Sequence, residues 1–240
     1  MTSPNGGPST PPTPPKLVIF NFDGTLFDTH DSMTHCISRT FQKLQPSKQP
    51  PSLVEIRATI ASGAGLERTF RTFLHQSTEI SSDADLKSWI STYRNLYTIE
   101  GQSLIKPFDN TTKVLRHLNN LQIPVVVIIN KGKQTIEKVL KREELTCLID
   151  LVVGDTRGVP PKPNPATFHS LVAPLYPKLA PKDILVVGDT EADILFAKNI
   201  GARSCWASYG YGNPARCEAL GYGAKINQLC DVLDVISKSN

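Results

Sequence analysis

The stretch LVIFNFDGTLFDT, residues 17–29, joins an apolar run to acidic and amide side chains, and its residue types are suited to chemistry. The run 17–20 predicts a short buried strand, and Asn21 and Asp23 follow where that strand ends. Ligands of parallel α/β sheets bind in the crevice at the carboxyl ends of the strands. The sequence therefore predicts a functional site directly after this strand.

A second apolar run, residues 184–187, ends in the sequence GDTEAD, which adds two carboxylates. Asp189 falls in the predicted turn, and Asp193 falls one helical turn later on the same face. An Asp at the start of a helix is commonly just an N-cap. Combined with Asp23 from another strand end, however, the pair supplies oxygen ligands of the kind that hold Mg²⁺. This combination predicts a magnesium site.

Two further stretches place basic and amide groups near the same sheet edge. Lys162 lies between prolines in GVPPKPNPATF, and the prolines fix an extended path that holds the lysine in place. The alternative for Lys162 is a solvated surface side chain. The predicted strand 125–129 is followed by Asn130 and Lys131, whose backbone amides begin the next helix, where anions are favoured.

These stretches resemble the four motifs of the haloacid dehalogenase superfamily. NFDGTLFD, residues 21–28, is similar to the first motif, D-x-D-G-T-L-x-D, and GDTEAD is similar to the fourth. The strand end at residues 129–131 resembles the second motif, and Lys162 resembles the lysine of the third. The loop SYGYGNP, residues 208–214, looks like that of the phosphoglycolate-phosphatase-like branch. The resemblance covers residues 16 to about 237.

The resemblance implies covalent phosphoryl transfer from a small phosphorylated metabolite, assisted by Mg²⁺. In the family, the first Asp attacks phosphorus, and the Asp two residues later protonates the leaving group and then activates water. Here Asp23 takes the second role, and Lys162 is the residue that would fix the phosphate. The ligands implied for the metal are Asn21, Asp23, Asp189 and Asp193.

Two departures from the family pattern fall beside the phosphate. Asn21 stands where the family has its nucleophile, and a neutral amide oxygen cannot replace a carboxylate in covalent catalysis. It also removes one negative charge from the metal site, which weakens Mg²⁺ binding. Ile129 stands at the hydroxyl position of the second motif and offers no donor, which leaves substrate binding to Asn130 and Lys162. Loss of a nucleophile costs about 10⁶-fold in turnover, so we expect turnover near background.

Three functions fit this pattern. The first is a phosphatase scaffold that still binds Mg²⁺ and a phosphorylated metabolite and is strongly impaired or inactive in phosphoryl transfer. The second is a non-hydrolytic enzyme that uses Asp23 as a general acid or base. The third is a non-catalytic binding or scaffold protein. We rank the first highest because the acidic residues and Lys162 all remain, while only the nucleophile and the hydroxyl are replaced.

The elements that must position these residues alternate between helices and strands from residue 108 onward. This alternation predicts an α/β fold, a Rossmann-like doubly wound parallel sheet whose right-handed crossovers bring the strand ends to one edge. The remaining predicted strands cover 148–153 and 204–207. The predicted helices cover residues 110–119, 134–141, 164–175, 191–199 and approximately 228–237.

The rest of the chain divides into an insertion and a tail. Residues 30–107 show helical spacing throughout, and the family resemblance implies that they form a mobile cap over the active site. The core then comprises residues 16–29 and 108–240. Residues 1–15 are rich in proline and carry no charge, which predicts a disordered tail.

Composition narrows the class of protein. The net charge of +4 over 240 residues is mild and scattered, which argues against a nucleic-acid partner. No apolar run approaches the roughly 18 residues of a membrane span. Five cysteines without a CxxC pair, and the lack of a signal peptide, indicate the cytoplasm. Oligomeric state and the particular substrate stay open at this stage.

Overall fold

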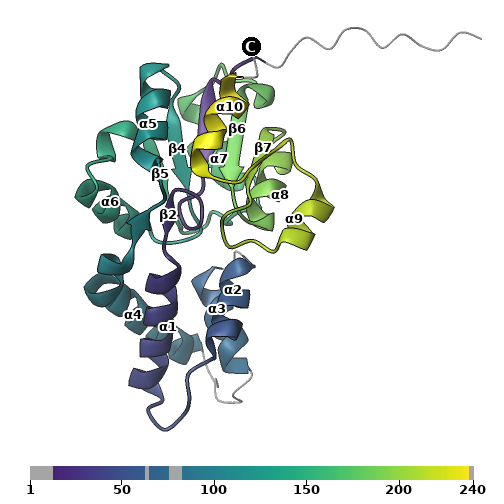
Figure 1. The fold of residues 1–240 in the computed structure, drawn as a ribbon. Helices are drawn as coiled ribbons and strands as arrows, with labels where there is room; N and C mark the ends of the chain where they lie inside the picture. Colours follow the sequence, from purple (N-terminus) through teal and green to yellow (C-terminus); the bar gives the residue numbers. More distant parts are fainter. Residues whose placement is uncertain (1–12, 63–64, 76–82, 238–240) are drawn as a thin grey trace, which may run out of the picture.

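The computed structural model describes residues 13–62, 65–75 and 83–237 (Figure 1). The predicted tail, residues 1–15, lies almost entirely outside these ranges. The central feature is a six-stranded parallel sheet in the order β5-β4-β1-β6-β7-β8. Its strands are β1 (Leu17–Phe20), β4 (Val125–Ile128), β5 (Leu151–Val153), β6 (Ile184–Gly188), β7 (Arg203–Ala207) and β8 (Ala224–Ile226). The predicted α/β class is confirmed.

The three central strands are buried along their whole length, as expected of a parallel sheet covered on both faces. Phe20, the last residue of β1, pairs with Val127 of β4 and with Val187 of β6. These strands therefore end at the same level. The residues that follow them, beginning with Asn21, lie side by side at one edge of the sheet.

Helices cover both faces of the sheet. Alternate strand residues such as Phe20 and Val127 pack in one cluster with α5 (Thr111–Asn120), α6 (Lys133–Arg142) and α10 (Val232–Ser237). The intervening residues, such as Ile19, pack with α7 (Ala166–Leu171) and α8 (Glu191–Asn199). This alternation follows from the period of two along a strand. The sheet is thus doubly wound.

The chain between β1 and β4 contributes a separate group of helices beyond the site edge of the sheet (Figure 1). Phe41, Phe70, Trp89 and Tyr93 form an aromatic cluster among them. The helices are α1 (His30–Leu44), α2 (Leu53–Ala61), α3 (Leu66–His75) and α4 (Asp83–Leu96), followed by the short helices η1 (Tyr97–Gly101) and η2 (Gln102–Leu104). We call them the inserted helices.

Several short elements differ from the sequence-based prediction. A two-stranded antiparallel sheet, β2 (Phe27–Asp28) with β3 (Lys106–Pro107), joins the ends of the insertion. The predicted helix 164–175 ends early as α7 and continues in a 3₁₀ turn, Ala173–Leu175. Both β8 and α9 (Pro214–Leu220) were not predicted. Elements of two to seven residues carry too few positions to show a period.

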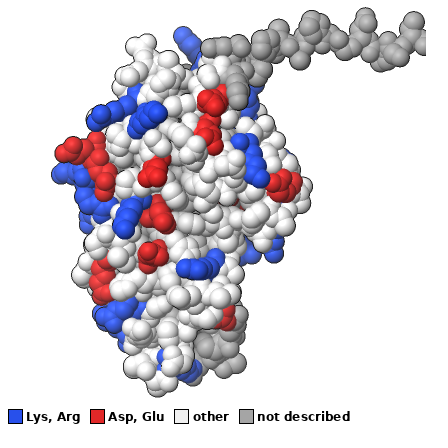
Figure 2. All heavy atoms as spheres, viewed as in Figure 1, with Lys and Arg blue, Asp and Glu red and all other residues white. Residues whose placement is uncertain are grey.

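The surface carries charges of both signs. Figure 2 shows Lys and Arg interspersed with Asp and Glu on the visible face, in keeping with the mild net charge of +4. Among the described residues, no helix is long and apolar enough to cross a membrane.

Candidate active site

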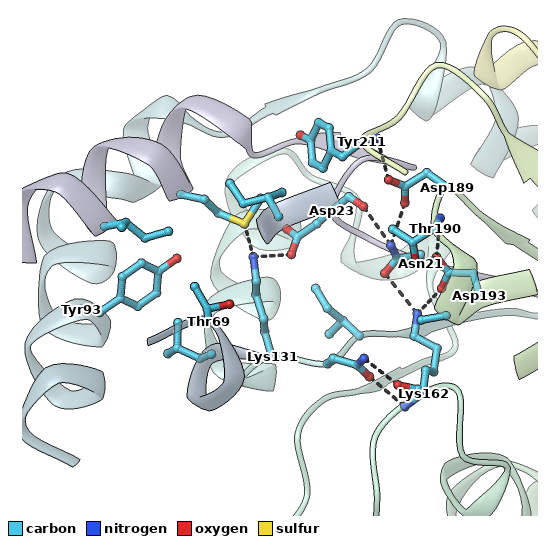
Figure 3. A pocket seen from close by; sticks show the side chains of 17 residues that line it. Asn21, Asp23, Thr69, Tyr93, Lys131, Lys162, Asp189, Thr190, Asp193 and Tyr211 are labelled. Carbon is cyan, nitrogen blue, oxygen red and sulfur yellow. Dashed lines mark hydrogen bonds and ion pairs between the residues drawn. The ribbon is translucent and has the colours of Figure 1, made fainter. Parts of the chain in front are cut away.

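Asn21 stands at the centre of the site, one residue beyond β1. Its backbone N–H still donates to Val187 O (2.8 Å), which fixes the residue at the sheet edge. Its side-chain Nδ2 donates to Asp189 Oδ1 (3.0 Å) and to the carbonyl oxygen of Asp23 (2.8 Å). Its Oδ1 accepts a hydrogen bond from Lys162 Nζ (3.2 Å). The strand end therefore brings three further predicted site residues into contact with Asn21 (Figure 3).

Lys162 is not a solvated surface lysine, because only 5% of its side chain is exposed. Besides Asn21, its Nζ donates to Asp193 Oδ1 (2.7 Å) and to Ile128 O (2.7 Å). Three acceptors around one ammonium group satisfy its three donors. The lysine is thereby locked between β4, the start of α8 and the end of β1.

Asp189 is fully buried behind Asn21. Its Oδ1 accepts from Thr25 Oγ1 (2.9 Å) as well as from Asn21, and its Oδ2 accepts from the backbone N–H of Tyr211 (2.9 Å). Burial and the nearby Asp193 carboxylate raise the pKa of Asp189 to about 7, although these hydrogen bonds act in the opposite direction. Each of the groups that donate these hydrogen bonds to the Asp189 carboxylate is uncharged.

Asp193 faces Lys162 and the first turn of its own helix. Its Oδ2 accepts from the backbone N–H (3.0 Å) and the hydroxyl (2.7 Å) of Thr190, so it completes a capping box at the start of α8. Its Oδ1 is taken by Lys162. Both of its oxygens are therefore committed within the protein.

Asp23 turns its carboxylate away from Asp189 and toward the inserted helices (Figure 3). Its Oδ2 forms an ion pair with Lys131 Nζ (2.6 Å), which also contacts Met33 Sδ and lies 5.9 Å from the ring centroid of Tyr97. Its Oδ1 is buried and has no hydrogen-bond partner among the described residues. One carboxylate oxygen thus remains to meet a ligand between the core and the inserted helices.

The end of β4 contributes Ile129 and Asn130. Ile129 is buried in the core and also lines the pocket, where it presents only apolar surface. The Asn130 amide brackets the main chain of Lys162, because its Oδ1 accepts from Lys162 N (2.9 Å) and its Nδ2 donates to Lys162 O (3.0 Å). The Asn130 side chain therefore positions Lys162, and only its backbone remains for a substrate.

These side chains surround a small cavity of about 70 Å³ that the inserted helices close from the other side. A much larger cleft, of about 1600 Å³, continues outward from it between α3, α4 and the core. Among the described residues, the acidic ones that line the cleft are Glu67 and Asp155. Its basic lining residues are Arg68, Arg71, Arg94, Lys131, Lys133, Arg157 and Lys162. The excess of positive charge suits an anionic ligand.

Comparison with known proteins decides the family. Residues 18–207, most of the chain, match the family described as haloacid dehalogenase-like hydrolase. The chain belongs to the haloacid dehalogenase-like hydrolase family. It is 26% identical over 227 residues to a phosphoglycolate phosphatase from Vibrio parahaemolyticus, with 93% of this chain and 97% of the relative covered. It is 23% identical over 227 residues to the pyrophosphatase PpaX of Bacillus cereus, with 94% and 98% covered.

Solved structures agree on the fold of this haloacid dehalogenase-like chain. A haloacid dehalogenase-like family hydrolase from Streptococcus pneumoniae superposes with a TM-score of 0.77 at 22% identity, covering 92% of this chain and 98% of its own. A predicted phosphoglycolate phosphatase from Haemophilus somnus gives a TM-score of 0.79 at 22% identity, covering 92% and 97%. These structures therefore support the haloacid dehalogenase-like fold of the chain.

Phosphatases of this family generally use Mg²⁺, but the side chains here do not fit the cation as they are arranged. Asn21 turns its NH₂ group, not an oxygen, toward Asp189. Both oxygens of Asp193 bond within the protein, and the Asp23 carboxylate pairs with Lys131. In the described part of the chain, no three His, Cys, Asp or Glu side chains gather to hold a metal ion.

Sequence reasoning missed the residues of the loop 208–214 that hold this family's first motif in place. Tyr209 donates its hydroxyl to Thr25 O (2.7 Å), and the Tyr211 hydroxyl lies 2.7 Å from both Asp28 Oδ1 and the backbone N of Thr29. Gly210 packs so closely that a Cβ there would overlap the side chain of Asp189. The only sequence signal was the Gly-rich, tyrosine-rich composition of the loop.

Proposed function

We propose that this protein binds a small phosphorylated metabolite between its core and inserted helices and is strongly impaired in phosphoryl transfer. The observation that carries the proposal is the set of bonds around Asn21. Its amide oxygen accepts from Lys162, and its amide nitrogen faces Asp189 and the Asp23 carbonyl. The group at the nucleophile position is thus neutral and fully hydrogen-bonded, whereas covalent catalysis needs an activated nucleophile.

Support for phosphate binding comes from the N-terminus of α6 and from the outer cleft. α6 begins at Lys133, two residues after Lys131 in the cavity wall, and helix N-termini favour anions. In the cavity Lys131 and Lys162 are paired with Asp23 and Asp193, but the described lining of the outer cleft has more basic than acidic residues. The phosphoglycolate phosphatase and pyrophosphatase relatives make a small phosphorylated compound the natural ligand class. We further propose that residues 30–107 act as a cap that closes over the bound ligand.

The test is phosphate release by the chain as written and by Asn21→Asp, Ile129→Ser and the double variant. The assay contains Mg²⁺ and offers p-nitrophenyl phosphate, 2-phosphoglycolate and pyrophosphate. We expect background rates from the chain as written and a gain of at least about 10⁴-fold from Asn21→Asp, within the 10⁶-fold effect of a nucleophile. Asn95→Asp, which adds the same charge on an exposed position of α4, is the matched control.

Turnover by the unmodified chain at rates typical of enzymes, about 1 s⁻¹ or more, would refute impairment. Background rates from both Asn21→Asp and the double variant would refute the phosphatase scaffold. Binding is tested separately by isothermal titration with inorganic phosphate, for which we expect saturable heat that Lys162→Met abolishes.

A second candidate is favoured by one observation, the buried Oδ1 of Asp23, which has no hydrogen-bond partner in the part of the chain that the structure describes. In this function Asp23 acts as a general acid or base on a bound metabolite without a covalent step. Activity of the unmodified chain that Asp23→Asn removes and Asn21→Asp does not increase would favour it over the first. We place either function in the cytoplasm, because all five cysteines are free thiols.

A further inference from the structure

The orientation of the Asn21 amide is fixed by the kinds of atoms around it. Lys162 Nζ can only donate, so the amide oxygen must face it (3.2 Å). The Asp23 carbonyl oxygen can only accept, and Asp189 Oδ1 already accepts from Thr25, so the NH₂ group must face them. A flipped amide would set NH₂ against an ammonium group and an oxygen against two oxygens. All donors and the acceptor of the side chain are therefore used.

The NH₂ group consequently lies between a carboxylate oxygen and a backbone carbonyl oxygen. Oxygens of these two types are the ligands that hard divalent cations take in proteins. A carboxylate at position 21 would offer one oxygen to Lys162 and a second to a cation. The amide has a single oxygen, which Lys162 occupies. If the Asn21 side-chain oxygen turned toward a cation at Asp189, it would lose its hydrogen bond from Lys162.

We infer that the Asn21 carboxamide takes the structural place of the divalent cation, so that this pocket assembles without Mg²⁺. Its two N–H groups bridge Asp189 and the Asp23 carbonyl, which a cation would otherwise draw together. The inference concerns the site of the proposed function, but it does not depend on whether the chain turns over a substrate. Metal-independent assembly is a property of the folded pocket.

The charges around Asn21 agree with this inference. Lys131 forms an ion pair with Asp23 and Lys162 forms one with Asp193, whereas Asn21 meets Asp189 with a neutral donor. An Asp at position 21 would set a second carboxylate against Asp189, and a divalent cation would offset that repulsion. The amide therefore lowers the electrostatic demand for a cation as well as filling its place.

The experiment is a titration of the full chain with Mn²⁺, a paramagnetic substitute for Mg²⁺, followed by electron paramagnetic resonance of the free ion. We expect Asn21→Asp to bind one Mn²⁺ per chain, and the chain as written to bind at least tenfold more weakly. We also expect a hundredfold excess of Mg²⁺ over the dissociation constant to raise the Tm of Asn21→Asp by about 5 to 10 °C. Mg²⁺ should leave the Tm of the unmodified chain and of Asn95→Asp unchanged. Mn²⁺ affinity of the chain as written within tenfold of Asn21→Asp overturns the inference.

A second measurement stands if Asn21→Asp fails to fold. In the ¹⁵N-labelled chain as written, the side-chain amide resonances of Asn21 are assigned by through-bond experiments. We expect slow hydrogen exchange and unchanged positions when Mg²⁺ is added, and no selective broadening by Mn²⁺. Selective broadening of these resonances overturns the inference. If the unmodified chain binds metal but does not turn over substrate, this inference is wrong and the proposed function stands. If it turns over substrate in the presence of EDTA, the proposed impairment is wrong and this inference stands.

Discussion

The buried ion pair between Lys162 and Asp193 gives a quantitative prediction for Lys162→Met. The two side chains are 5% and 2% exposed, and their atoms Nζ and Oδ1 are 2.7 Å apart. Methionine keeps most of the length of the side chain but leaves Asp193 Oδ1, Ile128 O and Asn21 Oδ1 without this donor. Removing one partner of a buried pair costs about 3 to 5 kcal/mol, because the other charge stays buried and uncompensated.

We therefore expect the free energy of unfolding in urea to fall by about 3 to 5 kcal/mol, and the Tm to fall on the order of 10 °C. The double variant Lys162→Met/Asp193→Asn removes both charges, so it should lose less than the sum of the single variants. Lys133→Met is the control, since Lys133 pairs with Glu137 on an exposed face and such pairs contribute about 0.3 to 0.5 kcal/mol. A loss below about 1 kcal/mol in Lys162→Met, or strict additivity in the double variant, would refute this account of the site.

Three further predictions follow from the same structure. Gly210→Ala should lower the free energy of unfolding by about 1 to 3 kcal/mol, because its Cβ would overlap Asp189. Gly132→Ala should cost far less, since a Cβ there would meet nothing within 4 Å, and equal urea midpoints for the two variants would contradict this. Tyr211→Phe should cost about 1 to 2 kcal/mol through the lost bonds to Asp28 and Thr29, and an unchanged urea midpoint would count against it. With a thiol reagent, exposed Cys147 should react first. Burial raises the pKa of the thiols of Cys36, Cys205 and Cys217 to about 12, so these three should react only on unfolding. Rapid reaction of all five cysteines would exclude the packing described.

The sequence was informative wherever a residue follows a long apolar strand. Asn21 and Asp189 come together because β1 and β6 end at the same level and their apolar runs are visible in the sequence, whereas Lys162 joins them from the loop after β5. The direction in which a side chain points was harder to predict from the sequence. Asp193 caps its own helix and pairs with Lys162, and neither contact was predicted from the sequence; its role as a metal ligand stays a prediction.

Other features depend on contacts between segments far apart in the chain. Lys131 pairs with Asp23 and also contacts Met33 of α1, so its surroundings include the inserted helices as well as the core. The role of Tyr211 depends on its loop folding back over residues 183 positions earlier. Neither spacing nor composition encodes such pairings. The short elements β2, β3 and β8 were missed for a related reason, because strands of two or three residues are formed by their partners.

The central claim is that Asn21 leaves an otherwise assembled phosphatase site without its nucleophile. The most direct test is intact-mass spectrometry of acid-quenched protein after mixing with p-nitrophenyl phosphate and Mg²⁺. We predict that Asn21→Asp gains the mass of one phosphoryl group, and that peptide mapping places it on residue 21. The chain as written should gain none. A phosphoryl adduct on the unmodified chain would contradict the claim.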